Sequence, residues 1–532
     1  MDSTLALLFG SFVLSLLGLL AFVGSMRHGL LVENPRGAGV IFEPGEQGHV
    51  DDPLAAQRPH AVADLHERLR ADRSSAMPVF MLILAACFWL LLGTGAGLVA
   101  SLKLHMPDWL VAQPWLSFGR IRTVHLNAVI YGWSSNACLA VVVWLLPRLL
   151  RTPLVGSHWV TLGAGVFNAG VAAGIGAIAA GVSDGMEFLE IPWQIGIFLV
   201  VGLLLIVASV LRTLVRRRTE HLYVSAWYFI SGLLWISLLY VVAKIPNLHT
   251  GVQQATMNWW FGHNALGLWF TPVSVGAIYY FLPKIIGRPV QSYNLSLLGF
   301  WTLAFFYGQV GGHHLIGGPV PGWLTSLSIV QSIMMIVPVV AFSVNQIGTM
   351  KGHWHVLRRS PTLRFMAFGA LMYMLSSLEG SLEALRSVNT VTHFTHFTVA
   401  HAHLGMYGFV SMVMFGAFYY MLPRVLSRDW PRPGLVTVHF VLASAGILLY
   451  VVALSIGGWL QGLAMLDAAR PFVESVTLTQ PYLQARSVAG VLLTLSHLVF
   501  VWHVLLLLGR RPEPATPPAT PVAPAAGATH AH

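Results

Sequence analysis

Charged side chains are scarce in this sequence of 532 residues. Asp, Glu, Lys and Arg together make up 9% of it, whereas hydrophobic residues make up 56%. A soluble domain has roughly 25% charged residues, so the composition excludes an ordinary soluble globule and indicates a protein that lies in lipid. The formal net charge is +10. The basic residues lie in short loops between apolar runs, which fits membrane topology and not a nucleic-acid-binding face.

Cysteine is almost absent. The two cysteines, Cys87 and Cys138, both lie inside apolar stretches, and the sequence contains neither a CxxC nor a CxxCH motif. This scarcity excludes a disulfide framework. It also excludes a covalently attached c-type haem and a thiolate copper centre within this chain.

Long apolar runs dominate what is present. Thirteen of them are long enough to cross about 30 Å of hydrocarbon as helices, which predicts an all-α, polytopic transmembrane bundle of a twelve-helix core plus one extra N-terminal helix. The predicted spans are 5–25, 77–101, 122–147, 159–182, 193–215, 222–243, 257–283, 293–317, 322–349, 364–385, 394–423, 435–462 and 483–508.

Three regions follow from this pattern. Residues 1–76 are predicted to hold a transmembrane anchor and a polar cytoplasmic loop, and residues 77–508 the twelve-helix core. Residues 509–532 are Pro/Ala-rich and are predicted to form a disordered cytoplasmic tail. No basic residue precedes the first run, which favours an anchor over a signal peptide.

The loops predict the orientation. Arginine and lysine gather in every second loop, and by the positive-inside rule these loops are cytoplasmic. The N-terminus is then outside and the C-terminus inside, in a membrane that we expect to be the bacterial inner membrane.

Histidines inside the apolar runs carry the chemical signal. The sequence has 23 histidines, and an ionisable group at membrane depth is costly and marks a functional site by default. The predicted topology brings six of them to a similar depth, nearer the outer face. They are His125, His263, His313, His314, His401 and His403.

Spacing suggests how these imidazoles divide among metals. His401 and His403 point about 200° apart on a helix, so that one helix can serve two metal centres. Adjacent His313 and His314 diverge by about 100°, which one ion near a helix end accommodates, and with His263 they form a three-histidine copper site. His125 and one of the 401/403 pair can hold a low-spin haem from both sides. The other histidine of the pair then ligates a second haem that faces the copper.

The motifs around these histidines resemble the haem–copper oxidase superfamily, in particular the catalytic subunit of cbb3-type cytochrome c oxidases. The likeness covers roughly residues 77–508. It rests on R-x-x-H-L-N-A-V-I-Y-G-W (122–133), W-W-F-G-H-N-A (259–265), Y-x5-H-H (307–314), E-G (379–380) and H-x-H-x-G (401–405).

The resemblance implies two b-type haems and one copper ion, CuB. It implies that His125 and His403 ligate the low-spin haem and that His401 ligates the high-spin haem. His263, His313 and His314 are then the CuB ligands.

The resemblance also implies roles for residues near the metals. Tyr307 matches a catalytic tyrosine that is crosslinked to the first copper histidine, and Glu379 matches an acid that hydrogen-bonds the proximal histidine. Such partners fix a ligand's orientation and raise its basicity. Arg122 matches an arginine that pairs with a haem propionate. Glu187 matches an external acid that can bind calcium, although a solvated acidic loop is a nearly equal interpretation.

Proton supply and partners are implied in the same way. Tyr279, Tyr293 and Ser296 match a single proton path from the cytoplasmic side. Electrons are expected from partner subunits that carry c-type haems on the outer face. The function implied is reduction of O2 to water coupled to proton translocation.

Two alternatives remain at this stage. A nitric oxide reductase of the same superfamily is one, because H-A-H-L-G-M-Y-G-F is similar in both groups and the usual W-A-G-P reads G-Q-V-G-G here. The familiar reductases have a glutamate where this sequence has Gly267, and this residue and the presence of Tyr307 favour oxygen. A proton-coupled transporter is the other, but the sequence has no internal repeat.

Overall fold

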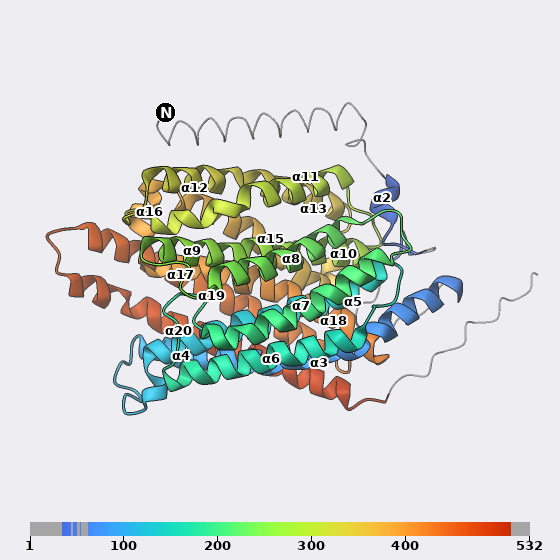
Figure 1. The fold of residues 1–532 in the computed structure, drawn as a ribbon, viewed down its shortest axis with the longest axis horizontal. Helices are drawn as coiled ribbons and strands as arrows, with labels where there is room; N and C mark the ends of the chain where they lie inside the picture. Colours follow the sequence, from blue (N-terminus) through green and yellow to red (C-terminus); the bar gives the residue numbers. More distant parts are fainter. Residues whose placement is uncertain (1–34, 44–45, 51–53, 55–61, 512–532) are drawn as a thin grey trace, which may run out of the picture.

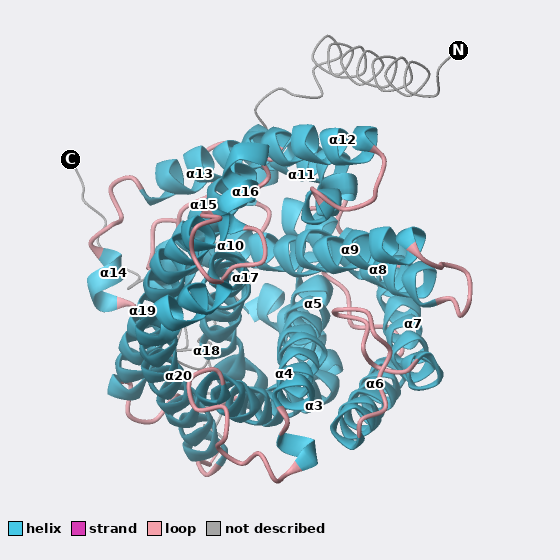
Figure 2. Cartoon of the chain, turned by 90° about the vertical axis from the view of Figure 1, so that its left-hand side faces the viewer, coloured by secondary structure: helices cyan, strands magenta, loops and turns pink. Residues whose placement is uncertain are grey.

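The computed structural model describes the chain except for residues 1–34, 44–45, 51–53, 55–61 and 512–532. The predicted N-terminal span 5–25 and most of the predicted tail therefore lie outside the described residues. In the part of the chain that the structure describes, all regular secondary structure is helical (Figures 1 and 2).

The helices fall in chain order as follows. The first half contains α2 (Pro35–Gly39), α3 (Val62–Lys103), η1 (Pro114–Leu116), α4 (Phe118–Asn127), η2 (Ala128–Ser134), α5 (Ser135–Leu149), α6 (Ser157–Ala180), α7 (Trp193–Val215), α8 (Val224–Lys244), α9 (Val252–Ala265), η3 (Leu266–Phe270) and α10 (Thr271–Ile286). The second half contains α11 (Tyr293–Phe306), η4 (Tyr307–Leu315), α12 (Gly322–Met334), α13 (Ile336–Met350), α14 (Val356–Arg359), α15 (Pro361–Glu383), α16 (Arg386–Thr392), α17 (His396–His403), η5 (Leu404–Ser411), α18 (Met412–Leu426), α19 (Gly434–Leu466) and α20 (Phe472–Leu508).

Eleven helices of the described chain are long and apolar enough to cross a membrane. They lie side by side with their axes roughly parallel, and an end-on view shows them following one another around the bundle (Figures 1 and 2). Neighbours in sequence are neighbours in space, and α20 closes the bundle by packing on α3. This is the predicted multi-pass, all-α membrane architecture.

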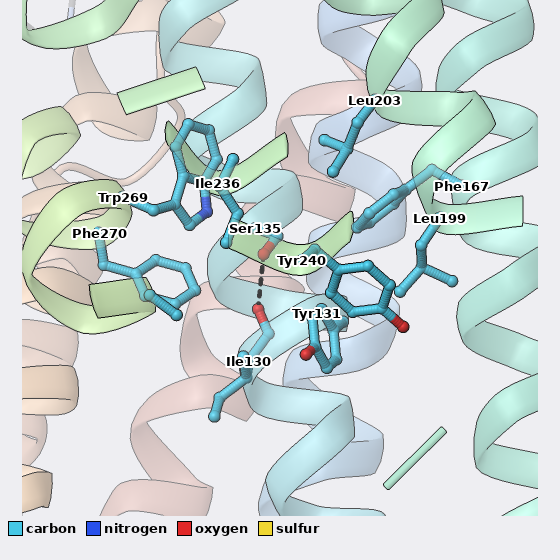
Figure 3. A pocket seen from close by; sticks show the side chains of 11 residues that line it. Ile130, Tyr131, Ser135, Phe167, Leu199, Leu203, Ile236, Tyr240, Trp269 and Phe270 are labelled. Carbon is cyan, nitrogen blue, oxygen red and sulfur yellow. Dashed lines mark hydrogen bonds between the residues drawn. The ribbon is translucent and has the colours of Figure 1, made fainter. Parts of the chain in front are cut away.

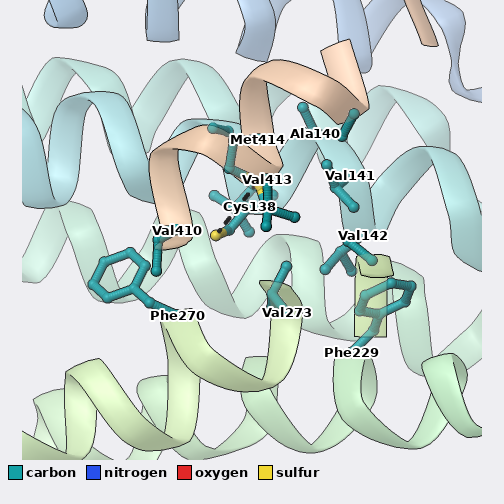
Figure 4. Close-up of a cluster of buried hydrophobic side chains, with 14 of the residues drawn as sticks. Cys138, Ala140, Val141, Val142, Phe229, Phe270, Val273, Val410, Val413 and Met414 are labelled. Carbon is teal, nitrogen blue, oxygen red and sulfur yellow. Dashed lines mark hydrogen bonds between the residues drawn. The ribbon is translucent and has the colours of Figure 1, made fainter. Parts of the chain in front are cut away.

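Three of these spans form the inside of the bundle. The most apolar windows of 118–149, 252–286 and 396–426 are 94%, 89% and 89% buried, whereas those of the other eight spans are 39–56% buried. A helix that is apolar on all sides but buried in protein contacts other helices and not lipid. Figure 4 shows this core where α5, α10 and α18 meet, with Val141, Val273 and Val413 packed around Cys138 and Met414.

One predicted span differs from the structure. The run 293–317 was expected to be a single helix, but α11 ends at Phe306 and continues as the tighter 3-10 helix η4 to Leu315. Successive residues of a 3-10 helix are about 120° apart, so the expected divergence of about 100° between His313 and His314 was too small. Glycines at 308, 311 and 312 weaken the α-helix here.

The first core helix begins earlier than predicted. α3 starts at Val62 and not at residue 77, so the charged segment expected to be a loop is partly helical. Its additional turns carry Arg68 and Asp72, which are held by ion pairs. Arg68 bonds Glu43 and Glu46, and Asp72 bonds Arg148.

These ion pairs attach the described residues 35–43 and 46–50 to the bundle. Lys284 at the end of α10 donates to the carboxylate of Glu46 and to the carbonyl of Ile41, and the amide of Gly48 donates to the carbonyl of Gly287. Burial raises the pKa of Glu46, but the charges of Lys284 and Arg68 outweigh it and lower the pKa to about 2. We call this end of the bundle, with the loops 284–292 and 424–433, the basic end.

Candidate metal centre

The six histidines lie at the end of the bundle opposite the basic end, where α4 begins and α9 and α17 are labelled in Figure 1. We call it the histidine end. His125 is on α4, His263 on α9, His313 and His314 on η4, and His401 and His403 on α17. The three innermost spans therefore supply four of the six imidazoles.

A π-helical segment follows the histidine in each of these three spans. η2 begins three residues after His125, η3 three residues after His263, and η5 directly after His403. A π-segment adds one residue to a turn and is found mostly at functional sites. The additional residue changes which face of the helix the histidine points to, and sequence periodicity gave no sign of it.

Three histidines form a compact cluster. One nitrogen from each of His263, His313 and His314 lies within 4.8 Å of the others, and among the described residues this is the only such group of three histidine, cysteine or acidic side chains. The centre of the His263 ring lies 4.9 Å from that of His313 and 5.2 Å from that of His314.

The surroundings of the cluster leave nitrogen lone pairs for a metal. Ser332 occupies Nδ1 of His313 at 3.0 Å, and the indole of Trp259 stacks on His314 at 3.9 Å. Nδ1 of His263 is buried and has no hydrogen-bond partner in the protein. An unpaired buried nitrogen costs about 1–3 kcal/mol, and coordination of a metal would remove that cost. The cluster therefore fits a copper ion held by three imidazoles.

Tyr307 lies beside this cluster. The centres of its ring and the His263 ring are 5.3 Å apart. Its ring also lies against Gly267, where a Cβ atom would overlap the phenol. The structure thus brings the predicted tyrosine to the predicted first copper histidine.

His125 and His403 form the second feature. Their rings are nearly parallel, with an interplanar angle of 7° and centres 6.3 Å apart. Nδ1 of His125 bonds the carbonyl of Gly93 at 2.7 Å, and Nδ1 of His403 bonds that of Val399 at 2.8 Å. With metal–nitrogen bonds of about 2 Å, this separation accommodates one metal between the two Nε2 atoms. The pair therefore fits a haem with two axial histidines.

Gly97 on α3 makes room for the ring of His125. A Cβ atom at residue 97 would stand 2.5 Å from Nδ1 of His125, so only glycine lets α3 approach the imidazole closely. On the other side, Tyr450 stacks on His403 with ring centres 4.4 Å apart, and its hydroxyl lies 3.3 Å from Nε2. Arg486 donates to that hydroxyl at 3.0 Å.

His401 faces away from this pair. Spacing left open which of His401 and His403 pairs with His125, and this orientation favours His403 for the pair and His401 for the second haem. Its Nδ1 lies 3.1 Å from the carboxylate of Glu379. A Cβ atom at Gly380 would stand 2.9 Å from Cε1 of His401. The E-G pair of α15 thus supplies one residue that orients the ring and one that makes space for it.

The loop 181–192, between α6 and α7, holds the remaining predicted acid. Arg122 forms an ion pair with Glu187. Glu187 belongs to no group of three metal-binding side chains among the described residues. Its neighbour Glu190 accepts from Asn127 at 3.1 Å. Burial raises the pKa of Glu190 to about 7, and the bond from Asn127 opposes that rise.

The predicted proton-path residues lie near one another in the half of the bundle next to the basic end. The hydroxyl of Tyr293 forms a hydrogen bond of 2.8 Å with Nε2 of His221. The hydroxyl of Ser296 donates to the backbone carbonyl of Tyr293 at 2.5 Å. Tyr279 is buried and stacks on Tyr228, with ring centres 6.1 Å apart. The loop residue His221 was missed because a lone histidine outside an apolar run carries no signal.

The structure also contains residues that sequence reasoning did not single out. Arg486 on α20 and Tyr450 on α19 lie beside the His125–His403 pair, and no motif marks them. Glu383 lies one turn after Glu379, is 7% exposed and has a carboxylate oxygen without a partner. The only sequence signal for Glu383 was its position four residues after Glu379.

An apolar pocket lies elsewhere in the bundle (Figure 3). It is lined by side chains of η2, α5, α6, α7, α8 and η3, including Phe167, Leu199 and Trp269. No histidine or carboxylate lines it, so it is not a metal centre.

Comparison with known proteins agrees with this geometry. The family model for cytochrome c and quinol oxidase polypeptide I matches residues 77–492. A cytochrome c oxidase subunit 1 homolog of Agrobacterium tumefaciens (strain T37) is 32% identical, over 81% of this chain and 83% of that protein. The cbb3-type cytochrome c oxidase subunit CcoN1 of Stutzerimonas stutzeri is 32% identical, over 78% of this chain and 91% of that protein.

Two more distant likenesses complete the comparison. A nitric oxide reductase chain of Stutzerimonas stutzeri is 24% identical over 74% of this chain and 87% of that protein. A haem–copper terminal oxidase dimer solved by cryo-electron microscopy shares the fold. It has a TM-score of 0.69 and 16% identity, and the match covers 83% of this chain and 85% of that one.

Fold, site and relatives together define a membrane-embedded oxidoreductase of the haem–copper class. The chain belongs to the cytochrome c and quinol oxidase polypeptide I family, as a subunit I of the cbb3 type.

Proposed function

We propose that this chain is the catalytic subunit of a respiratory terminal oxidase, which reduces O2 to water and couples the reaction to proton translocation. One observation carries the proposal: Tyr307 lies beside the three-histidine cluster, at the end of the bundle that also holds the proximal candidate His401. Two b-type haems and CuB, when bound, would supply electron transfer and oxygen chemistry at that site.

We assign the ligands from the geometry above. His125 and His403 would hold the low-spin haem, because their parallel rings leave room for one metal. His401 would hold the high-spin haem, and His263, His313 and His314 would hold CuB. The unpaired Nδ1 of His263 supports the copper assignment most directly.

Glu379 acts by positioning His401. Its carboxylate accepts a hydrogen bond from Nδ1–H of the imidazole, so the proton stays on Nδ1 and Nε2 keeps the lone pair that a metal needs. A carboxylate partner also makes the imidazole a stronger donor.

Tyr307 acts as a source of a proton and an electron. Its phenol lies beside His263, so its hydroxyl would be placed to give up a proton at the copper site. A crosslink between Tyr307 and His263 is part of the proposal, and their proximity is compatible with it.

Oxygen, and not nitric oxide, is the proposed substrate. Gly267 lies so close to Tyr307 that any side chain there would displace the phenol. The position cannot hold both a glutamate, as in the familiar nitric oxide reductases, and this tyrosine in its present place. The similarity to the Stutzerimonas stutzeri nitric oxide reductase makes nitric oxide reduction the second candidate. Membership of the oxidase family argues against the transporter hypothesis.

Arg122 and Glu187 are proposed to serve the haem propionates at the histidine end. Arg122 would pair with a propionate and with Glu187 together, because a guanidinium has five donors. Arg486 donates to the hydroxyl of Tyr450, which stacks on His403, and is a second cation for this purpose. Glu187 as a calcium ligand remains a proposal that the ion pair with Arg122 does not favour.

Protons for the chemistry would come from the basic end, which we propose is cytoplasmic, with the N-terminus outside and the C-terminus inside the bacterial inner membrane. His221, Tyr293, Ser296 and Tyr279 form the proposed path. The bond between His221 and Tyr293 supports it, since it joins a loop side chain to the buried hydroxyls.

Electrons would come from partner subunits with c-type haems. This chain has no CxxCH motif of its own. We expect these subunits on the outer face, nearest the His125–His403 pair.

Metal analysis of the purified complex tests the proposal. We expect two haem irons in this chain for each copper, and O2 turnover well above turnover of nitric oxide measured in the same preparation. Iron in place of copper, with nitric oxide as the faster substrate, would support the second candidate instead.

A further inference from the structure

Phe188 in the loop 181–192 has an unusual backbone conformation. Its φ angle is 66°, in the left-handed region that few residues other than glycine adopt. Such a conformation costs free energy and persists only where the surrounding structure imposes it, and residues of this kind gather at functional sites. The function proposed above gives Phe188 no part.

Side chains from three different helices impose this conformation. Three successive backbone carbonyls, those of residues 187–189, each accept a hydrogen bond. The donors are Nδ2 of Asn258 on α9 at 2.6 Å, the hydroxyl of Tyr131 on η2, and Nζ of Lys244 on α8 at 2.6 Å. The backbone on both sides of Phe188 is thus fixed, and the direction of its side chain is fixed with it.

The phenyl ring of Phe188 lies in a space on α9 next to the three-histidine cluster. A Cβ atom at residue 262 would stand 2.8 Å from Cδ2 and 3.3 Å from Cε2 of this ring, and these would be its nearest neighbours. The absence of a side chain at Gly262 is therefore what admits the ring. The next residue, His263, is the first candidate copper ligand.

From this position the ring packs against Trp259, which lies about one turn before His263. The two aromatic rings meet edge to face, with centres 6.5 Å apart and an interplanar angle of 77°. The indole in turn stacks on the imidazole of His314, with centres 3.9 Å apart and an angle of 11°. Phe188, Trp259 and His314 therefore form one packed series of rings that ends at a candidate copper ligand.

His314 depends on this stacking more than its neighbour His313 does. Nδ1 of His313 forms a hydrogen bond of 3.0 Å with Ser332, which fixes the plane of that ring. Among the residues that the structure describes, no hydrogen bond reaches a ring nitrogen of His314, and Trp259 is its closest ring contact. The indole then sets the plane of the His314 ring, which decides where the nitrogen lone pair points.

We propose that Phe188 is a positioning residue for the copper site, which acts through Trp259 on His314. Packed against the indole, the phenyl ring limits rotation of the Trp259 side chain and so keeps the indole parallel to the imidazole. The same loop carries Glu187, the ion-pair partner of Arg122. The inference rests on the copper site of the proposed function.

Removing the phenyl ring should weaken copper binding and leave the haems in place. In the purified complex with Phe188→Ala, we expect the dissociation constant for copper, measured by competition with a chelator, to rise at least fivefold. Groups that orient a metal ligand commonly contribute about 10–100-fold to affinity. Phe188→Leu refills the space beside Gly262 and should recover most of the loss. Phe472→Ala, at a position of α20 that is 71% exposed, is the control.

Two double variants test the contacts themselves. In Gly262→Ala the added Cβ atom should displace the phenyl ring, so copper affinity should again fall at least fivefold. With Phe188→Ala in the same chain the overlap is gone, and the loss should be no greater than in Phe188→Ala alone. Trp259→Leu should also lower the affinity, and Phe188→Ala should add nothing to its effect.

An independent readout is spectroscopic. Carbon monoxide released by light from the haem can bind copper, and its infrared stretching band reports the arrangement of the three imidazoles. We expect this band to shift in Phe188→Ala and in Gly262→Ala but not in Phe472→Ala. Wild-type copper affinity with an unmoved band in Phe188→Ala would overturn the inference, as would losses that simply add in the double variants. A wild-type complex without copper would refute the proposed copper site itself, and the inference with it.

Discussion

The α-carbon of Gly267 lies directly against the phenol ring of Tyr307. A Cβ atom at 267 would overlap ring atoms of the tyrosine, so the phenol can lie beside His263 only because the residue four positions after that histidine has no side chain.

Replacing this glycine should displace the tyrosine. We expect Gly267→Ala to lower O2 turnover at least tenfold and to destabilise the protein by about 1–3 kcal/mol, the usual cost of overpacking a core. The control is Gly165→Ala, where a Cβ atom meets nothing within 4 Å. Normal turnover in Gly267→Ala would show that the phenol does not need its present position.

Removing the phenol hydroxyl should abolish catalysis without removing the metals. In Tyr307→Phe we expect O2 turnover to fall by roughly a hundredfold or more, since a positioned proton donor contributes a factor of that order. Haem spectra and copper content should be unchanged. Tyr240→Phe removes another buried hydroxyl, one without a protein partner, and should keep full activity. Equal activities in the two variants would refute the role of Tyr307.

Removing one imidazole of the parallel pair should affect one haem only. In His125→Ala we expect the low-spin absorption bands to disappear, while carbon monoxide still binds the high-spin haem that His401 would hold. The exposed His158→Ala is the matched control. Retention of the low-spin spectrum in His125→Ala would contradict the axial assignment.

The buried carboxyl of Glu190 should make stability depend on pH. Its pKa rises from 4.5 to about 7 on folding, so the unfolded chain releases this proton first and the folded state loses stability as pH increases from 4.5 to 7. At about 1.4 kcal/mol for each pKa unit, the loss at pH 8 is on the order of 3 kcal/mol. We expect Glu190→Gln to raise the unfolding temperature at pH 8 but not at pH 4. Equal effects at both pH values would exclude titration of Glu190 as the cause.

The attachment of residues 46–50 to the bundle should depend on the charge of Glu46. Glu46→Gln removes the partner of Lys284 and Arg68, so hydrogen–deuterium exchange at Gly48 and His49 should become faster. Because the pKa of Glu46 is lowered to about 2, wild-type protein should keep slow exchange until the pH falls below about 4.5. Equal exchange rates in variant and wild type at pH 7 would show that the ion pairs do not hold the segment.

The metal site was largely predictable because its signal is local. Histidines are costly at membrane depth, so their presence in apolar runs marks them whatever the packing. Alternating basic loops then place His125, His263 and His403 at one level. Arg486 and Tyr450 were not predictable in this way. They lie on α20 and α19, and only the packing of α17 on α19 and of α19 on α20 brings them beside His403.

The sequence by itself determined the class of fold and, through the histidines in its apolar runs, which residues form the candidate metal site. The length of each apolar run and the placement of the charged loops fix how deep each helix lies in the membrane. This depth is one coordinate of the helix, and it follows from the sequence. The tertiary structure alone decided which imidazole faces which. Rotation of each helix about its axis depends on side-chain packing and on the π-segments after His125, His263 and His403. A one-residue change of helical pitch turns every later side chain to another face, and no local pattern in the sequence records it.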